Sequence, residues 1–135
     1  MNRFSFTVKA IVCTLLLAAQ SGCTSDDGPP MGRVIGEVTI EGKPIAEGVI
    51  HFSSIDGSTK TVSTYIIQGK FDERVPVGKN RVEISAVSIP PLAPGQNPET
   101  LVAKETVPAK YNLASELTAE IKKGTNDLKF ALSKK

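Results

Sequence analysis

Apolar and polar residues alternate along the chain from residue 33 onward, with the period of two that is typical of β-strands. Clusters of glycine, proline, asparagine and aspartate separate these runs, and such clusters favour turns. No segment of useful length has the 3.6-residue period of a helix. The pattern predicts strands at residues 34–40, 49–53, 61–67, 71–75, 81–86, 116–121 and 128–132.

Short strands at this spacing favour an all-β fold, namely an antiparallel sandwich of about seven strands. The segment 88–98 is rich in proline, which cannot donate to a strand ladder, so we expect a long surface loop there. Alternate strand residues face opposite sides of a sheet. The register therefore predicts an interior that includes Phe52, Val82, Ile84, Leu117, Ile121, Leu128 and Phe130. It predicts solvent exposure for their neighbours His51, Glu83, Thr118, Glu120 and Lys129.

The first 22 residues have a different pattern. A basic start is followed by an apolar run at 10–19, then by small residues and Cys23. This order is typical of a secretory signal peptide. The apolar run is about half the length of about 20 residues that a membrane-spanning helix needs. We therefore expect residues 1–22 to direct export and then to be removed.

Ser21 and Gly22, directly before Cys23, resemble the lipobox of bacterial lipoproteins, although Gln20 stands where that motif usually has an aliphatic residue. The resemblance implies that the thiol of Cys23 is acylated and that Cys23 becomes the first mature residue. Cys13 would leave with the signal peptide, so acylation would also remove the one remaining reactive thiol. The alternative is ordinary signal cleavage near Gly22, which would leave that thiol free.

These features divide the chain into a signal peptide at 1–22, a polar lipidated tether at 23–32 and one β-sandwich domain at 33–135. Without the two basic residues of the signal peptide, 14 basic and 14 acidic side chains remain. A neutral surface with no basic cluster argues against nucleic-acid binding. We expect an exported protein that is lipid-anchored to a cell-envelope membrane, with its domain in the periplasm or at the cell surface.

Short motifs within the domain resemble the carboxypeptidase-regulatory-like domain, namely VTIEGKPI at 38–45, GVIHF at 48–52 and GKF at 69–71. Later runs, VPAKYN at 107–112 and LTAEIKKG at 117–124, resemble the small bacterial lipoproteins that carry this domain. The resemblance implies a transthyretin-like Greek-key sandwich. It also implies no catalytic role, because in carboxypeptidases such domains lie beside the catalytic domain and do no chemistry.

Candidate catalytic residues are sparse. His51 is the only histidine, and the alternation places it on the outer face of a strand without evident partners. Asp56, Asp72 and Glu73 lie beside glycine turns, where an aspartate stabilises the turn through its own side chain. We therefore expect no enzyme activity, no catalytic residues, no cofactor and no metal site, including at Asp26 and its neighbour in the tether.

The predicted function is that of a membrane-anchored, non-enzymatic binding or scaffold module of the bacterial cell envelope. Its partners would be the membrane, through the lipid, and an envelope protein or polysaccharide. One alternative is a carbohydrate- or envelope-polymer-binding domain, which needs an exposed aromatic patch or polar groove around Tyr65, His51 or Tyr111. We expect Tyr111 itself to bond backbone at a sandwich corner. A second alternative is a small hydrolase, which needs a pocket that joins His51 to a carboxylate.

Overall fold

The structure is a computed structural model, and it describes residues 28–135. The predicted signal peptide at 1–22, the predicted lipidation site Cys23 and the tether as far as residue 27 lie outside the described residues. Among the residues described, no helix is long and apolar enough to cross a membrane.

Every predicted strand is present in the described part of the chain, which contains no α-helix. Two 3₁₀ turns lie at Pro98–Thr100 and Ala109–Tyr111. The first strand begins at Met31, two residues before the start we expected for the domain. The strands are β1 (Met31–Ile40), β2 (Lys43–Pro44), β3 (Glu47–Ser54), β4 (Val62–Ile67), β5 (Lys70–Pro76), β6 (Gly78–Ser85), β7 (Val87–Ser88), β8 (Lys104–Glu105), β9 (Thr118–Ile121) and β10 (Gly124–Leu132).

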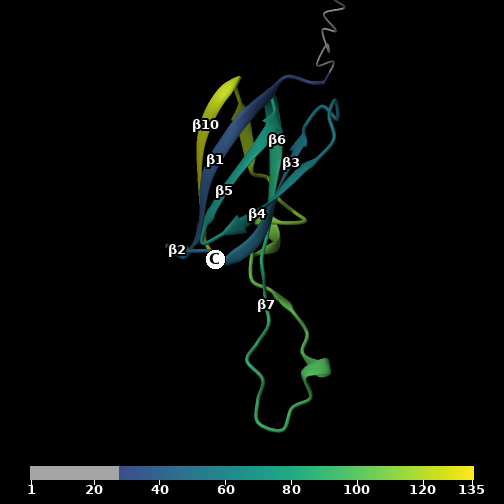
Figure 1. The fold of residues 1–135 in the computed structure, drawn as a ribbon, viewed down its shortest axis with the longest axis vertical. Helices are drawn as coiled ribbons and strands as arrows, with labels where there is room; N and C mark the ends of the chain where they lie inside the picture. Colours follow the sequence, from purple (N-terminus) through teal and green to yellow (C-terminus); the bar gives the residue numbers. More distant parts are fainter. Residues whose placement is uncertain (1–27) are drawn as a thin grey trace, which may run out of the picture.

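The main sheet curls into the two layers of a sandwich (Figure 1). Its strand order is β10-β1-β5-β4-β3-β6-β9, and the short β2 pairs with β1. β4 and β5 pair only at Ile67 and Lys70, so the sheet splits there into a layer β10-β1-β5 and a layer β4-β3-β6-β9. The predicted all-β sandwich is confirmed.

One pair of strands is parallel rather than antiparallel. β1 and β10 run side by side in the same direction, in a register that pairs Gly32 with Gly124 and Ile40 with Leu132. β9 ends beside the start of β6, and the turn at Lys122–Lys123 carries the chain directly to the other layer. β10 therefore starts at the same end of the sandwich as β1 and has to run the same way.

The core has the predicted register. Phe52, Val82, Ile84 and Ile121 are buried, while Leu117, Leu128 and Phe130 are half-buried and pack against them. Thr118, Glu120 and Lys129 are exposed as predicted. His51 and Glu83 are half-buried instead of fully solvated. They lie on the two central strands of their layer, where His51 contacts Ser63 and Glu83 contacts Arg81.

The hairpin between β4 and β5 is a tight turn at Gln68 and Gly69, whose φ values are +52° and +76°. Two consecutive residues with positive φ are typical of the type I′ turn that closes a two-residue hairpin. The turn also packs closely, since a Cβ on Gly69 would lie 2.6 Å from the Cβ of Pro44. This turn fixes where the two layers meet.

A long excursion leaves the sandwich after β6, which we call the arm (residues 87–105). β7 and β8 pair at its base, and the remainder includes the predicted proline-rich loop at 88–98. Every residue from 87 to 100 is exposed, so the predicted surface loop is confirmed. The arm projects from one end of the sandwich, and β1 begins at the opposite end (Figure 1). We call these the arm end and the tether end.

Candidate binding surface

Large apolar side chains are exposed on the outer face of the β4–β3 layer, at its arm end. Tyr65, Ile67 and Val87 expose 74%, 63% and 60% of their surfaces. Val49 lies beside Tyr65 in the strand register. These four residues, which we call the Tyr65 surface, line a groove of about 380 Å³ together with Glu47, Gly48 and Ile66.

A second groove lies on the other side of Tyr65, where β4 and β5 separate. It has a volume of about 550 Å³ and is lined by Ile35, Thr64, Tyr65, Ile67, Lys70, Phe71 and Asp72. The groove exists because the two strands pair only next to their shared turn and then diverge into different layers. Tyr65 therefore lies between the two grooves, on the strand at the free edge of its layer.

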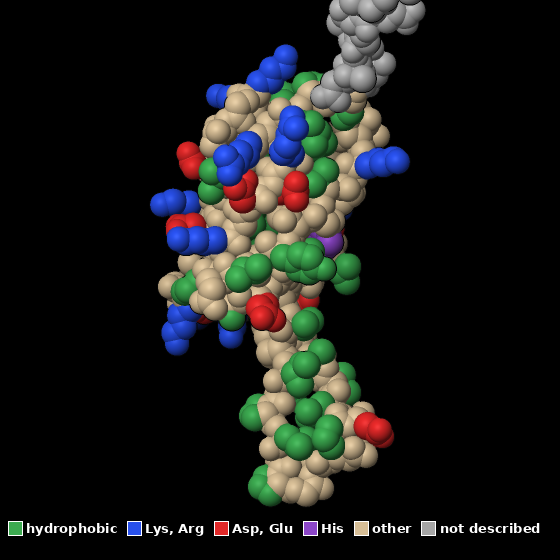
Figure 2. Space-filling view, in the orientation of Figure 1, with side chains coloured by type: hydrophobic (Ala, Val, Ile, Leu, Met, Phe, Trp, Pro, Cys, Tyr) green, Lys and Arg blue, Asp and Glu red, His purple; other side chains and the backbone are tan. Residues whose placement is uncertain are grey.

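The arm continues the apolar surface away from the sandwich. Val87 belongs both to the base of the arm and to the groove beside Tyr65. Further along the arm, Ile89, Leu92 and Val102 are exposed, the last by 78%. Figure 2 shows hydrophobic side chains over much of the arm and few charged ones. Such contiguous apolar exposure is uncommon on monomers and marks interaction sites.

The base of the arm is fastened by the carboxylate of Glu105. Its Oε1 accepts hydrogen bonds from the backbone N–H groups of Ala86 (2.9 Å), Thr106 (3.0 Å) and Val107 (2.9 Å). Its Oε2 accepts from the Ser85 hydroxyl and from Nδ2 of Asn112 (3.1 Å). The N–H of Thr106 also donates to the Ala86 carbonyl at 2.8 Å. The two ends of the arm are therefore held together at its base. The arm is an insertion between two segments of the sandwich that already lie side by side.

The hydrogen bonds to Glu105 also affect its ionisation. Partial burial alone would raise the pKa of this carboxyl, but the donors Ser85, Val107, Ala86 and Thr106 together outweigh it. The pKa of Glu105 is therefore held below its usual value. Sequence reasoning missed this residue, because its donors come from β6 and from the segment that follows the arm, and no local motif brings them together.

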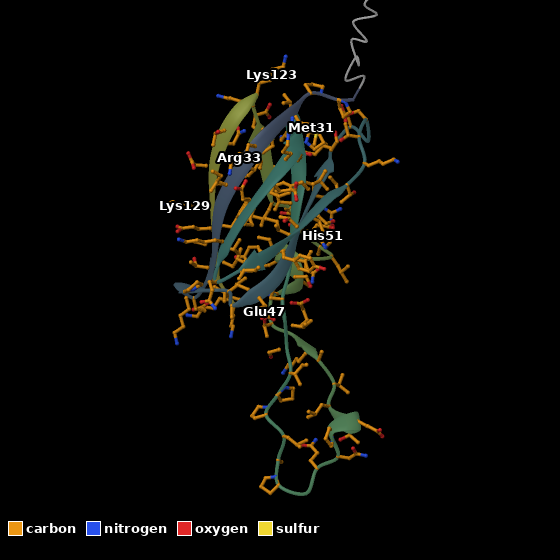
Figure 3. All side chains as sticks on the ribbon, in the orientation of Figure 1. Met31, Arg33, Glu47, His51, Lys123 and Lys129 are labelled. Atoms are coloured by element: carbon orange, nitrogen blue, oxygen red, sulfur yellow. The ribbon has the colours of Figure 1, made fainter. Side chains whose placement is uncertain are left out.

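His51 lies midway along the sandwich on the outer face, between β4 and β6 (Figure 3). Its Nδ1 is 2.6 Å from the hydroxyl of Ser63. Glu83 is its register partner on β6, but the Glu83 carboxylate forms an ion pair with Arg81 at 2.8 Å. His51 lines neither of the grooves described above. The hydrolase alternative requires a pocket around His51, and the geometry gives it no support.

Tyr111 has the structural role that we predicted. It is half-buried, and its hydroxyl accepts a hydrogen bond from the backbone N–H of Ser133 at 3.2 Å. The ammonium of Lys110 lies 4.9 Å from the centre of its ring. Both its hydroxyl and one side of its ring are thus engaged within the chain. Of the two tyrosines, Tyr65 is the one whose ring faces solvent.

The carboxylates beside the turns differ in their roles. Asp56 accepts from the Ser54 hydroxyl and from the N–H of Ser58 at 2.9 Å, and these bonds lower its pKa to about 2. Its predicted turn-stabilising role is confirmed. The prediction was wrong for Asp72, which lies within β5 and forms two hydrogen bonds of 2.9 and 2.5 Å with the Arg33 guanidinium on β1. These bonds lower the pKa of Asp72.

Within residues 28–135, no group of three or more histidine, cysteine, aspartate and glutamate side chains is placed to hold a metal ion. Asp56, Asp72 and Glu73 accept hydrogen bonds from a hydroxyl, from backbone N–H groups and from an arginine.

No protein-family model matches the chain, and no curated protein matches it. Among solved structures, the chain is similar to a DUF3823 family protein from Parabacteroides merdae ATCC 43184, with 15% identity and a TM-score of 0.42. That match covers 77% of this chain and 46% of the other, so the chain spans less than half of that protein. It is also similar to the dioxygenase domain of a dioxygenase carbohydrate-binding protein fusion from the cellulolytic bacterium Streptomyces sp. SirexAA-E, with 16% identity, a TM-score of 0.39 and coverage of 82% and 84%. Likenesses this remote assign no family.

Proposed function

We propose that this protein is a non-enzymatic binding module of the bacterial cell envelope, anchored to a membrane by an acylated Cys23. The observation that carries the binding function is the exposed apolar surface that runs from Tyr65 through Val87 onto the arm. Large apolar side chains that are exposed to water lower the solubility of a protein, and a bound partner would cover them. The resemblance to the carboxypeptidase-regulatory-like domain supports a binding role rather than a catalytic one.

The arrangement of the two ends supports the anchored function. β1 begins at the tether end, near Met31, and the arm leaves from the opposite end (Figure 3). A lipid on Cys23 would hold the tether end next to the membrane. The Tyr65 surface and the arm would then face away from the lipid, where an envelope partner can reach them.

Carbohydrate binding is the second candidate, and the exposed ring of Tyr65 favours it. A sugar-binding platform usually combines several aromatic faces with polar groups. The Tyr111 ring packs against the core and has Lys110 over one side, so Tyr65 supplies a single aromatic face. The groove beside Val87 is lined largely by aliphatic side chains, whereas Lys70, Phe71 and Asp72 also line the groove on the β5 side. A protein partner with apolar side chains matches this lining better than a polysaccharide does.

The binding proposal is tested by capture of partners from envelope extracts with the lipidated full chain. We expect Tyr65→Ala to remove the specifically captured partner, because the variant deletes the centre of the apolar surface. His51→Ala is the matched control, since His51 lies on the same face but outside the grooves. If both variants captured the partner as well as the wild type, the Tyr65 surface would not be the binding site. Loss with His51→Ala alone would place the binding site at His51 instead of the Tyr65 surface.

The anchoring proposal is tested by Cys23→Ser and membrane fractionation. We expect the variant to leave the membrane fraction and to lose its acyl chains by mass spectrometry. Two or more acyl chains give stable anchoring, whereas one chain is marginal. A variant that pelleted with membranes as the wild type does would contradict the lipid anchor.

A further inference from the structure

One edge of the sandwich has free main-chain groups. β4 pairs with β3 along its whole length but meets β5 only at Ile67 and Lys70. In the part of the chain that the structure describes, no other strand pairs with β4. On this edge, Thr64 and Tyr65 line the groove between the layers instead of pairing with another strand.

The hairpin geometry shows which groups are free. In a two-residue hairpin the closing residues, here Ile67 and Lys70, exchange hydrogen bonds with each other. In an antiparallel ladder, the main-chain groups of alternate residues point to opposite sides. The N–H and C=O groups of Ser63 and Tyr65 must then point away from β3, toward the open edge. Those of Thr64 point toward β3.

This edge lacks the features that normally keep sheet edges from pairing. The sequence of β4, VSTYII, has no charged residue, proline or glycine. The other three edge strands of the two layers carry charged residues, namely Asp72, Glu73 and Arg74 on β5, Glu120 on β9, and Asp127 and Lys129 on β10. Natural proteins use such charges to discourage edge pairing. The contrast indicates that the β4 edge is left open for a partner.

We propose that the β4 edge binds an extended, uncharged segment of a partner polypeptide as an additional β-strand. The inference rests on the proposed function, because it specifies the chemistry of the partner at the Tyr65 surface. Alternating donors and acceptors at strand spacing recognise a peptide main chain. The groove on the β5 side of Tyr65 lies along this edge and offers space for side chains of the added strand.

A second copy of the chain fits this edge less well. β4 runs from the tether end to the arm end, since Val62 pairs with Phe52 and Ile67 pairs with Glu47 near the arm. Two β4 strands paired antiparallel about a two-fold axis would turn the second copy end for end. Its tether would then leave at the arm end of the first copy, away from the membrane that holds the first tether. A segment of another protein has no such constraint.

The first test uses the full mature chain with Cys23→Ser and hydrogen exchange resolved to single amides. The probe is a synthetic peptide of alternating threonine and valine that spans β4 and has lysine at each end. In the free protein we expect fast exchange at Ser63 and Tyr65 and slow exchange at Thr64. With the peptide at about ten times its Kd, exchange at Ser63 and Tyr65 should slow by about tenfold, because the free fraction falls in proportion.

The matched control is the same peptide with N-methyl groups on the amides that face β4. Losing these hydrogen bonds should weaken binding by about tenfold or more. Equal binding of both peptides would overturn the proposal. So would protection of Ser63 and Tyr65 in the free protein together with a dimer in sedimentation, since that result would assign the edge to a second copy.

A pair of variants separates this inference from the proposed function. Ser63→Pro removes one edge N–H and is compatible with an edge position, whereas Ser63→Val keeps it. We expect the first to lose partner capture and the second to keep it, with unfolding curves confirming that both fold. If Tyr65→Ala lost the partner and a folded Ser63→Pro kept it, the binding function would stand and the added strand would be wrong.

Discussion

Removing the Glu105 carboxylate should loosen the base of the arm and lower the stability of the domain. Five donors converge on this carboxylate, three of them backbone N–H groups. A hydrogen bond to a charged group contributes about 1.5–3 kcal/mol when its partner is buried. Glu105 is largely exposed, so water competes for each bond. We expect a loss of about 2–4 kcal/mol for Glu105→Ala and about 1–3 kcal/mol for Glu105→Gln, which keeps one acceptor.

The contribution of Glu105 to the stability of the fold depends on pH. The pKa of Glu105 is lowered in the folded protein, so its contribution to stability is present above the unfolded value of about 4.3. It is lost as pH falls through the lowered folded pKa, because the protonated acid no longer accepts all five bonds. Asp56 and Asp72, whose pKa values are also lowered, destabilise both proteins in acid. The difference between wild type and Glu105→Gln isolates Glu105 from them.

The assay is urea unfolding of the Cys23→Ser mature chain, followed by circular dichroism, with and without Glu105→Gln. We expect a constant difference in the free energy of unfolding between about pH 5 and pH 7, above the ordinary glutamate pKa. The difference should shrink toward zero below that range. Equal stability at pH 7 would refute the role of Glu105. A difference that persisted unchanged in strong acid would show that shape, rather than charge, accounts for it.

Three further predictions test the core, the arm and the expectation that the fold needs no metal. Phe130→Ala should lower the free energy of unfolding by about 2–4 kcal/mol, which is less than a fully buried phenylalanine would give because Phe130 is half-buried. Lys129→Ala should change it by under about 0.5 kcal/mol. A larger effect at Lys129 than at Phe130 would show that the assigned register is reversed. Replacing residues 88–104 with an Asn-Gly turn should leave the unfolding midpoint within a few degrees by calorimetry, and a collapse of the fold would show that the arm is structural. A chelator should leave that midpoint unchanged, and a large shift would reveal a metal site.

Alternation in the sequence located the strands because one buried face imposes a period of two on every strand. Val82 and Ile84 on β6 are fully buried, and Glu83 between them faces outward, as the alternation predicts. The turn at Gln68 and Gly69 was similarly recognisable, because a glycine there permits positive φ. Burial and turn chemistry are local properties, and they can be deduced without knowing which strands pair.

Pairing itself depends on distant segments. Nothing in the pattern of β10 distinguishes a parallel partner from an antiparallel one, and the direction follows only from where β9 ends. The separation of β4 from β5 has the same origin, so the open edge and the groove beside Tyr65 could not be predicted. Sequence analysis named Tyr65 as an aromatic candidate, and its exposure reflects its place on the outer face of a strand that meets β5 only at Ile67.

The arm and the Tyr65 surface are connected through one strand. Glu105 binds Ser85 and Ala86 at the end of β6, and Ser85 is the register partner of Val49 in the Tyr65 surface. The carboxylate therefore sets the position of Val87 relative to Tyr65. Loosening it should weaken partner capture while the sandwich stays folded, because the core lies between the layers and does not include the arm. We expect a folded Glu105→Gln variant to capture less partner and Lys129→Ala to capture a normal amount. That result would show that the arm and the sheet edge form one binding surface. Unchanged capture by Glu105→Gln would show that the two surfaces act separately.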